Sequence, residues 1–214
     1  AVADLPERSE ALADLATITA LTADGEPAAT FTDAARVIET RPDVIVEAAG
    51  PDVARTNAEG WLDAGIDVLV MSVGALADPA VLARLDAAAR RSGRAVLVPS
   101  GAIGGLDAIR AARLGGLASV ELRTTKAPRS LAGAPGIAAA GVDLDAIDRP
   151  TVVFEGNARE AVLAFPANLN VVAALSLAGL GVDRTHVVLV ADPAETRNVH
   201  EIRASGEFGE LTLR

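Results

Sequence analysis

A change of pattern at residues 98–107, VPSGAIGGLD, divides the sequence into two parts. Before this stretch, short apolar runs alternate with segments of helical composition, whereas after it this alternation stops. Strands that alternate with helices are typical of a parallel sheet with right-handed crossovers. We therefore expect an α/β protein of two domains, with a parallel sheet in residues 1–99 and an α+β domain with a mixed, largely antiparallel sheet in residues 100–214.

The N-terminal part contains apolar runs that we interpret as strands, at residues 1–4, 42–50, 66–72 and 94–98. The run at 94–98, RAVLV, is rich in β-branched residues and predicts a strand buried on both faces of the sheet. Helices are expected at residues 6–13, 31–39, 51–64 and 78–91. The resulting order of strands and helices predicts parallel pairing.

The C-terminal part has a different pattern of apolar and polar residues. Residues 117–125 alternate apolar and polar side chains, which predicts a strand with one face in water. Residues 130–149 are rich in alanine, glycine and proline and predict a loop with a short helix over the site. Further strands are expected at residues 151–156, 185–192, 198–205 and 207–213, and helices at 106–113, 158–164 and 171–180.

Composition excludes several classes of partner. The 214 residues carry a formal net charge of −10 and show no basic patch, so we expect no nucleic-acid partner. No apolar run approaches the ~18 residues of a membrane span, and the N-terminus does not have the pattern of a signal peptide. The sequence has no cysteine, which excludes disulfides and thiolate metal sites and is compatible with a cytoplasmic protein.

Three glycines and a serine separate the strand expected at 94–98 from the helix expected at 106–113. Glycine lets the backbone approach a flat ligand closely and leaves its N–H groups unobstructed. In parallel α/β sheets, ligands bind at the carboxyl ends of the strands. Ser100 and Gly101 are therefore candidate cofactor contacts, although an ordinary strand-to-helix turn is the alternative interpretation.

Asp4 follows an apolar run, at the position where the second strand of a Rossmann fold places an acid on the adenosine ribose. Arg8 follows one turn later and could instead meet the 2′-phosphate of NADP, so the choice between NAD and NADP stays open. No segment matches G-x-G-x-x-G. If residues 1–99 form a Rossmann domain, its first strand, phosphate loop and first helix are missing from this sequence.

The chain has two histidines. His200 lies two residues from Asn198, so both side chains are expected on one face of a strand. A titratable imidazole beside an amide is a candidate functional pair. His186, at the start of another expected strand, is interpreted as structural. Because no histidine–carboxylate cluster and no cysteine occurs, we expect no metal site.

Lys126 is the single lysine of the chain, and Arg123 lies close to it in the sequence. Both are candidate contacts for substrate carboxylates, although a solvated lysine is the alternative interpretation. Asn168 and Asn170 precede an expected helix, where asparagine is a common cap. One of them could equally bind a carboxamide ligand.

Several motifs follow one another along the chain: VEAAG at 46–50, SVGALAD at 72–78, PSGAIGGLD at 99–107, FPANLNV at 165–171, ADP at 191–193, NVHEI at 198–202 and GEFG at 206–209. Together they resemble the L-aspartate dehydrogenase family over essentially the whole chain. The resemblance implies a Rossmann domain followed by an α+β domain, a homodimer, and a cofactor that is NAD or NADP. It also implies oxidation of L-aspartate to iminoaspartate, which feeds NAD biosynthesis or hydrolyses to oxaloacetate and ammonia.

Position by position, the resemblance implies that His200 is the active-site histidine and that Ala102 and Asn170 contact the cofactor. The sequence departs from the family in lacking the opening strand with its Gly-rich phosphate loop and a closing segment with a helix. The stretch KAP at 126–128 is close to the family's motif of a basic residue with prolines but not identical to it. We expect a family member that lacks both ends.

Two other functions compete with this interpretation. One is a related two-domain NAD(P) reductase, such as a homoserine dehydrogenase or a dihydrodipicolinate reductase, which a substrate panel would separate. The other is a non-catalytic dimerisation or ligand-sensing module. The missing Gly-rich loop favours it, because a pyrophosphate would lose its helix N-terminus, whereas the presence of His200 and Asn170 argues against it.

Overall fold

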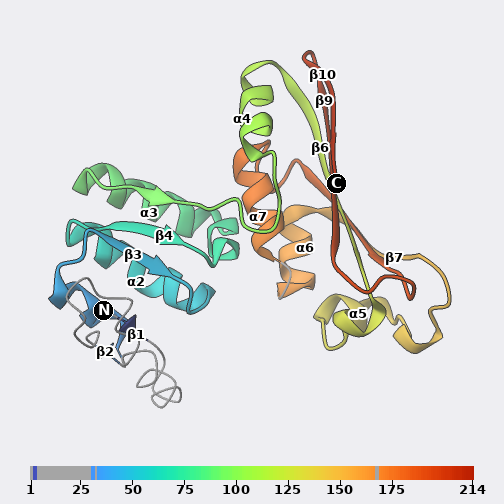
Figure 1. The fold of residues 1–214 in the computed structure, drawn as a ribbon, viewed down its shortest axis with the longest axis horizontal. Coiled ribbons are helices and arrows are strands. Elements are labelled where there is room, and N and C mark those ends of the chain that lie inside the picture. Colours follow the sequence, from blue (N-terminus) through green and yellow to red (C-terminus); the bar gives the residue numbers. More distant parts are fainter. Residues whose placement is uncertain (1, 4–29, 32, 167–168) are drawn as a thin grey trace. The chain divides into compact units, whose positions relative to one another are not determined.

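The computed structural model describes residues 2–3, 30–31, 33–166 and 169–214 (Figure 1). The chain divides into two compact units, Ala1–Pro99 (unit 1) and Ser100–Arg214 (unit 2). Unit 1 holds a parallel sheet, and unit 2 holds a larger, mixed and mostly antiparallel sheet. The fold class expected from the sequence is therefore confirmed.

Unit 1 is built from parallel strands. Three of them, β3 (Val44–Glu47), β4 (Asp67–Val70) and β5 (Val96–Leu97), lie side by side in that order, and β1 (Val2–Ala3) pairs with β2 (Thr30–Phe31). The helical segments are η3 (Ala34–Thr40), α2 (Pro51–Asp63), η4 (Val73–Ala77) and α3 (Pro79–Ser92). Parallel strands need such crossover connections, because a short turn cannot return the chain in the same direction.

Local sequence signals set the ends of α2 and α3. Both helices begin at a proline, which lacks only an N–H that the first turn leaves unpaired in any case. Asp78 caps α3 by accepting a hydrogen bond of 2.8 Å from the Ala80 N–H, and α3 ends at Gly93, whose φ of 68° suits glycine. Helix α2 packs on β4, where Val68 and Val70 are fully buried.

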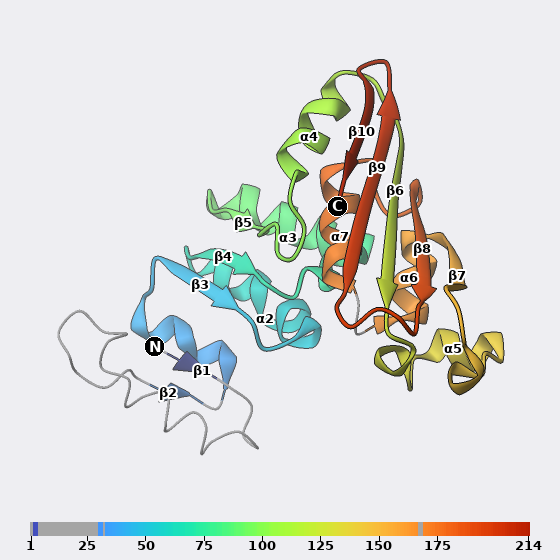
Figure 2. The ribbon, with the colours of Figure 1, turned by 45° about the vertical axis from the view of Figure 1, so that its right-hand side comes forward.

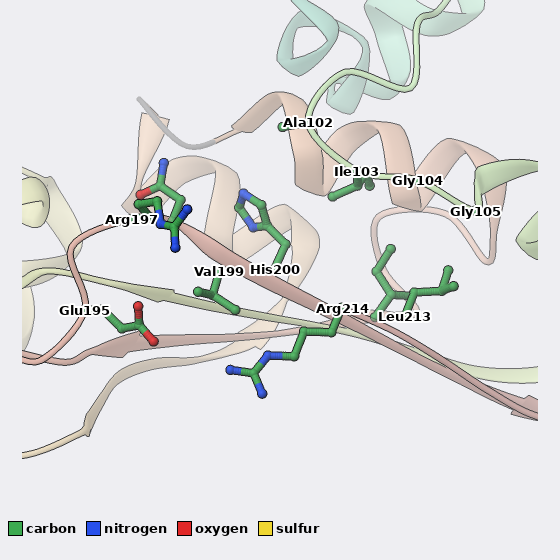
Figure 3. A pocket seen from close by; sticks show the side chains of 12 residues that line it. Ala102, Ile103, Gly104, Gly105, Glu195, Arg197, Val199, His200, Leu213 and Arg214 are labelled. Atoms are coloured by element: carbon green, nitrogen blue, oxygen red, sulfur yellow. The ribbon is translucent and has the colours of Figure 1, made fainter.

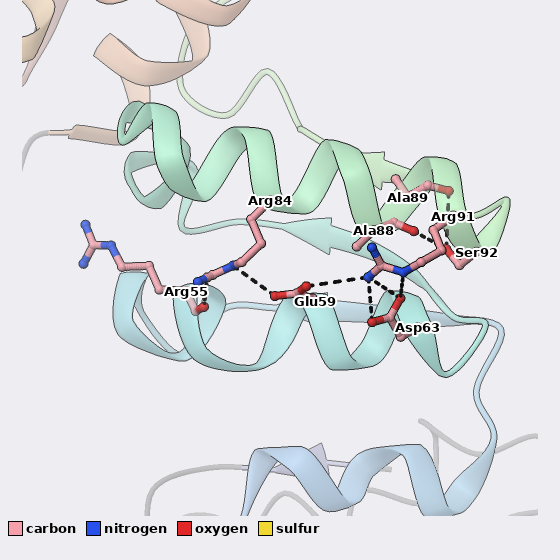
Figure 4. Close-up of polar contacts among 8 residues, drawn as sticks. All are labelled: Arg55, Glu59, Asp63, Arg84, Ala88, Ala89, Arg91 and Ser92. Carbon is pink, nitrogen blue, oxygen red and sulfur yellow. Dashed lines mark hydrogen bonds and ion pairs between the residues drawn. The ribbon is translucent and has the colours of Figure 1, made fainter.

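Ion pairs link the outer surfaces of α2 and α3 (Figure 4). Arg91 Nη2 lies 2.8 Å from Asp63 Oδ1, and Arg84 Nε lies 3.1 Å from Glu59 Oε2. All four side chains are more than a third exposed, so water screens these pairs strongly. Burial of the apolar helix faces is therefore the main source of stability here.

The prediction that residues 94–98 form a strand buried on both faces is wrong. Strand β5 contains only Val96 and Leu97, lies at the edge of its sheet, and leaves Leu97 43% exposed. On β3, Val46 is 60% exposed. The register makes Val46, Leu69 and Leu97 neighbours on one face, while the described helices pack against the other. The apolar composition of residues 94–98 therefore did not reveal that Leu97 is partly exposed among the described residues.

The helix expected at residues 31–39 begins later than predicted. Phe31 belongs to β2, and η3 starts after Asp33, whose side chain accepts a hydrogen bond of 2.9 Å from the Ala35 N–H. An aspartate in this position caps a helix and so fixes its first residue. The helix expected at residues 6–13 and the candidate residue Asp4 lie outside the described residues.

Unit 2 contains five strands in the spatial order β10-β9-β6-β8-β7 (Figure 2). Their bounds are β6 (Leu117–Lys126), β7 (Thr151–Asn157), β8 (Thr185–Ala191), β9 (Val199–Gly206) and β10 (Gly209–Leu213). The central strand β6 runs parallel to β8 and antiparallel to β9, and the remaining neighbours are antiparallel. This pairing confirms the mixed sheet expected after residue 100.

Helices cover one face of the unit 2 sheet. They are α4 (Leu106–Leu114), α6 (Ala158–Ala164) and α7 (Leu169–Ala178). On β6, Val120, Leu122 and Thr124 are buried, while the residues between them are half-buried. A Cβ at Gly179 would lie only 3.2 Å from Val120 Cγ2, which shows how closely the chain after α7 approaches β6. The alternation predicted for residues 117–125 is thus confirmed.

Residues 127–150 form a compact excursion between β6 and β7. It contains η5 (Pro128–Leu131), α5 (Pro135–Ala140) and η6 (Leu144–Ala146), so the expected short helix is present. That this loop lies over the site stays a prediction. Leu131 and Ile137 anchor it against Phe165 and Leu189. Among the described residues, no helix is long and apolar enough to cross a membrane.

Candidate active site

A cavity of about 650 Å³ lies in unit 2 between the glycine loop and the beginning of β9 (Figure 3). Its size is typical of small-molecule sites. The lining residues come from the loop before α4, from the segment that enters β9, and from the end of β10: Ala102, Ile103, Gly104, Gly105, Glu195, Arg197, Asn198, Val199, His200, Ile202, Leu213 and Arg214.

The glycine loop forms one wall of the cavity. Gly101 and Gly105 have φ angles of 63° and 72°, which other residues adopt only with strain. A Cβ at Gly105 would also overlap the end of the Leu213 side chain, which would have to move, so the positive φ is the main reason for glycine here. By contrast, a Cβ at Gly104 would meet no atom within 4 Å, so the backbone there is open to a ligand. Buried Ile103 anchors the loop.

His200 projects from β9 toward this loop (Figure 3). Its direct partner on β6 is Thr124, and Thr124 Oγ1 lies 3.0 Å from His200 Nδ1. Since Nδ1 is engaged in this way, Nε2 is the ring nitrogen left for a ligand. Burial lowers the pKa of His200 below its usual 6.5, and the positive charge of Lys126 lowers it further. The imidazole is therefore neutral at neutral pH.

Lys126 ends β6 on the same face as Thr124. Its side chain is 8% exposed, which is unusual for lysine, and burial lowers its pKa from the usual 10.5. The amino group and the imidazole thus share one polar end of an otherwise apolar sheet face. Such a pair suits an anionic ligand that also has to give up a proton.

The structure brings some of the other candidate residues to this cavity and leaves others outside it. Ala102 and Asn198 line it. Ser100 and Gly101 precede Ala102 in the same exposed loop without lining the cavity. Asn170 lies in the first turn of α7 and is exposed, also outside the lining.

Arg123 does not join Lys126 and His200. It pairs with Glu201 on β9 and Val188 on β8, one residue out of phase with Thr124. Because side chains alternate along a strand, Arg123 points to the face opposite His200. Because Arg123 is close to Lys126 in the sequence, we expected both to bind substrate carboxylates. The alternation of side chains along β6 places them on opposite faces, which corrects that expectation.

Two residues of the site were missed in the sequence. Thr124 was covered only by the strand expected at residues 117–125, and Arg197, which directly precedes the motif at 198–202, was given no role. Arg197 lines the cavity, and no acidic side chain among the described residues pairs with it. The pairing of Thr124 with His200 depends on the β6–β9 register, which no local pattern reveals. Arg197 directly precedes the candidate residue Asn198, and this nearness could have marked it as a candidate in the sequence.

His186 occupies the opposite face of the sheet. Its Nδ1 lies 3.1 Å from Glu121 Oε2, and its Nε2 lies 3.4 Å from Glu155 Oε1. These contacts bridge the neighbouring strands β6, β8 and β7. They agree with the structural interpretation of this histidine and make it a matched comparison for His200.

Within unit 1, the described residues include a buried carboxylate at the carboxyl edge of the sheet. Glu47, 2% exposed, accepts hydrogen bonds at Oε1 from the N–H groups of Ala49 and Gly50 and from the Ser72 hydroxyl. Its Oε2 accepts a further bond from the Ser72 N–H at 3.1 Å. One side chain thereby ties the turn after β3 to the turn after β4, at the edge where parallel sheets bind ligands.

No group of three or more acidic or histidine side chains in the described part of the chain is placed to hold a metal ion.

Comparisons with known proteins match both units. The family described as "Aspartate dehydrogenase, C-terminal" matches residues 107–214, and the family described as "Homoserine dehydrogenase, NAD binding domain" matches residues 2–99. The solved structure of an aspartate dehydrogenase from Thermotoga maritima is 27% identical, with a TM-score of 0.75, covering 98% of this chain and 85% of that one.

Curated relatives are more similar in sequence. The L-aspartate dehydrogenase of Ralstonia nicotianae is 52% identical over 176 residues, which is 81% of this chain and 65% of the relative. The L-aspartate dehydrogenase of Cupriavidus necator is 48% identical over 199 residues, which is 92% of this chain and 72% of the relative. The chain thus spans about two thirds of the length of these relatives.

Proposed function

The chain belongs to the aspartate dehydrogenase family, and we propose that it oxidises L-aspartate to iminoaspartate with NAD or NADP as the hydride acceptor. Hydrolysis of the product would give oxaloacetate and ammonia, and the imine itself would feed NAD biosynthesis. The observation that carries the proposal is the placement of His200 in the wall of the cavity with Lys126 on the same face.

The glycine loop fits the nicotinamide end of such a cofactor. The space beside Gly101 and Gly104 is free of protein atoms within 4 Å of a Cβ position, and Ala102 and Ile103 add an apolar flank. A flat ring with a carboxamide needs this combination of an open backbone and a small apolar side chain. We propose Ala102, with Ser100 and Gly101 beside it, and Asn170 as the contacts of this end of the cofactor.

His200 is proposed as the catalytic base. The bound cofactor supplies the acceptor for the hydride that leaves Cα. The amine of aspartate must lose a proton so that its lone pair can form the C=N bond, and a neutral imidazole can accept that proton at Nε2. The lowered pKa of His200 keeps the ring in this form at neutral pH.

Substrate carboxylates need cationic or N–H partners. We propose Lys126 and Arg197 for this role, with Asn198 as a further hydrogen-bond donor. Lys126 is buried on the His200 face without lining the cavity, and Arg197 lines it. Glu195 also lines the cavity. We do not include Arg123, because β6 directs it to the other face.

We further propose that unit 1 is the dinucleotide-binding domain, that unit 2 carries catalysis and dimerisation, and that the protein is a cytoplasmic homodimer. Family membership supports these assignments. Light scattering coupled to gel filtration tests the assembly, with twice the chain mass as the expected result.

The activity is tested by following reduced nicotinamide absorbance with L-aspartate and either NAD⁺ or NADP⁺. D-aspartate, L-glutamate and L-homoserine serve as comparison substrates. Turnover confined to L-aspartate is the expected result. Turnover with L-homoserine but not L-aspartate would instead support a homoserine dehydrogenase.

A further inference from the structure

We propose that Thr124 is a positioning residue that holds His200 in the tautomer with hydrogen on Nδ1, so that Nε2 presents its lone pair to the substrate. This inference rests on the proposed function of His200 as a base, but its central statement concerns the imidazole itself. It can therefore be tested without turnover.

The geometry makes the contact well defined. Thr124 and His200 are direct cross-strand partners in the β6–β9 ladder, and Oγ1 lies 3.0 Å from Nδ1. Threonine branches at Cβ, so its χ1 angle is restricted and the hydroxyl has few alternative directions. Thr124 is 5% exposed, so bulk water competes little for its hydroxyl. The ring is thus held from a stiff, buried side chain.

Polarity along β6 changes where the strand reaches the cavity. Its helix-facing side chains are Val120 and Leu122, then Thr124 and Lys126. The buried hydroxyl of Thr185 is bonded to the Gly181 carbonyl at 2.8 Å, whereas that of Thr124 faces the imidazole. A valine would fill the same space as Thr124 at this position, so the hydroxyl serves the histidine rather than the packing.

The proposed role of His200 as a base at Nε2 selects one direction for the hydrogen bond between His200 and Thr124. A neutral imidazole carries one N–H and one lone pair, so Nε2 can accept a proton only if Nδ1 carries the hydrogen. In that tautomer Nδ1–H donates to Thr124 Oγ1. After proton uptake at Nε2 both nitrogens carry hydrogen, and the Nδ1–H bond to Oγ1 persists unchanged. One acceptor therefore serves both protonation states, and the ring does not have to reorient during the cycle.

The opposite direction has a different consequence. If the hydroxyl donated to Nδ1, the hydrogen of the neutral ring would sit on Nε2, which could then donate to a ligand but not accept a proton. The two arrangements have the same heavy-atom geometry. They differ in which ring nitrogen carries the hydrogen, and this can be measured.

The measurement is the ¹⁵N chemical shifts of His200 in protein labelled at histidine. The chain has two histidines, so His186→Gln leaves a single imidazole to observe. At a pH above 7, long-range ¹H–¹⁵N correlations should show a protonated Nδ1 and an unprotonated Nε2. Thr124→Val should shift the population toward the Nε2–H tautomer that histidine favours in water, and Thr124→Ser should restore the original pattern.

The same variants give a catalytic readout. We expect Thr124→Val to lower kcat on the order of 10-fold, the loss that one neutral hydrogen bond accounts for, with little change in KM for L-aspartate. Thr124→Ser should recover most of this loss. Thr125→Val is the matched control, because the neighbouring hydroxyl lies on the opposite face of β6 and should affect neither readout.

An Nε2–H tautomer in the parent protein would overturn the proposal, as would a Thr124→Val protein that folds and keeps the parent pattern. If Thr124→Val does not fold, the Thr124→Ser spectrum and the parent tautomer still decide the matter. Full activity of a His200→Ala variant would refute the base role of His200 while leaving the tautomer result intact, so the two failures are distinguishable.

Discussion

Lys126 and His200 occupy the same face of the neighbouring strands β6 and β9, and each affects the proton affinity of the site. Burial is the main reason that the pKa of His200 lies below 6.5, and the positive charge of Lys126 is the second. The pKa of Lys126 is itself lowered by burial. A base that must be neutral is therefore placed beside a cation that discourages its protonation.

Lys126→Met should raise the pKa of His200, because it removes the repulsive charge while the methionine keeps the site buried. The acid limb of kcat/KM should consequently move to higher pH. An NMR titration of the His200 ring in a His186→Gln background gives the pKa directly. Arg123→Met removes a charge from the opposite face of β6 and is the control. It should leave the pKa of His200 unchanged.

Stability should also depend on pH through His200. In the unfolded chain the imidazole takes up a proton near its usual pKa of 6.5, whereas the folded protein does so only at lower pH. As the pH falls below 6.5, the unfolded state binds more protons and the free energy of unfolding decreases. Urea titrations at several pH values should show a weaker decrease in His200→Asn. An equal slope in both proteins would contradict the lowered pKa.

Arg197→Met should raise KM for L-aspartate by about 10-fold with a smaller effect on kcat, because a charge-assisted contact to a carboxylate is lost in the bound substrate. Steady-state kinetics with L-aspartate provide the test. Arg123→Met again serves as the comparison. Equal KM values for the two variants would remove Arg197 from substrate binding.

Glu47→Gln should destabilise unit 1 by about 1–3 kcal/mol, because an amide nitrogen in place of one carboxylate oxygen faces N–H or O–H donors that it cannot satisfy. Trp61, the single tryptophan and buried in α2, reports the unfolding of this unit by fluorescence. Glu39→Gln changes an exposed carboxylate in the same unit and should leave the midpoint of the unfolding transition unchanged. An unchanged midpoint for Glu47→Gln would show that the turns after β3 and β4 do not depend on this side chain.

Much of the fold could be predicted because its signals are local. Alternating apolar and polar residues indicated which face of β6 is buried, and the helix expected at residues 78–91 lies within one residue of α3 at each end. The burial of the unit 1 strands could not be predicted, since composition does not show whether a second layer covers Val46 and Leu97. Phe31 was assigned to a helix because its pairing partner, Ala3 in β1, lies far away in the sequence.

The candidate site was predictable only in part, for a related reason. His200 and Asn198 share a strand face, so their spacing was informative. The partners of His200 come from β6, more than 70 positions earlier, and depend on strand register. Period-two alternation then separates Arg123 from Lys126, although the two are close in sequence. Thr124 could be identified as the partner of His200 only once the pairing of β6 with β9 was known.

The central claim is that His200 performs the chemistry of L-aspartate oxidation. The most direct test measures L-aspartate-dependent reduction of the nicotinamide cofactor by the parent protein, His200→Ala and His186→Ala, with folding checked by circular dichroism. We expect His200→Ala to lose roughly 10²–10⁴-fold in kcat and His186→Ala to stay close to the parent. Near-parental turnover by a folded His200→Ala protein would contradict the account.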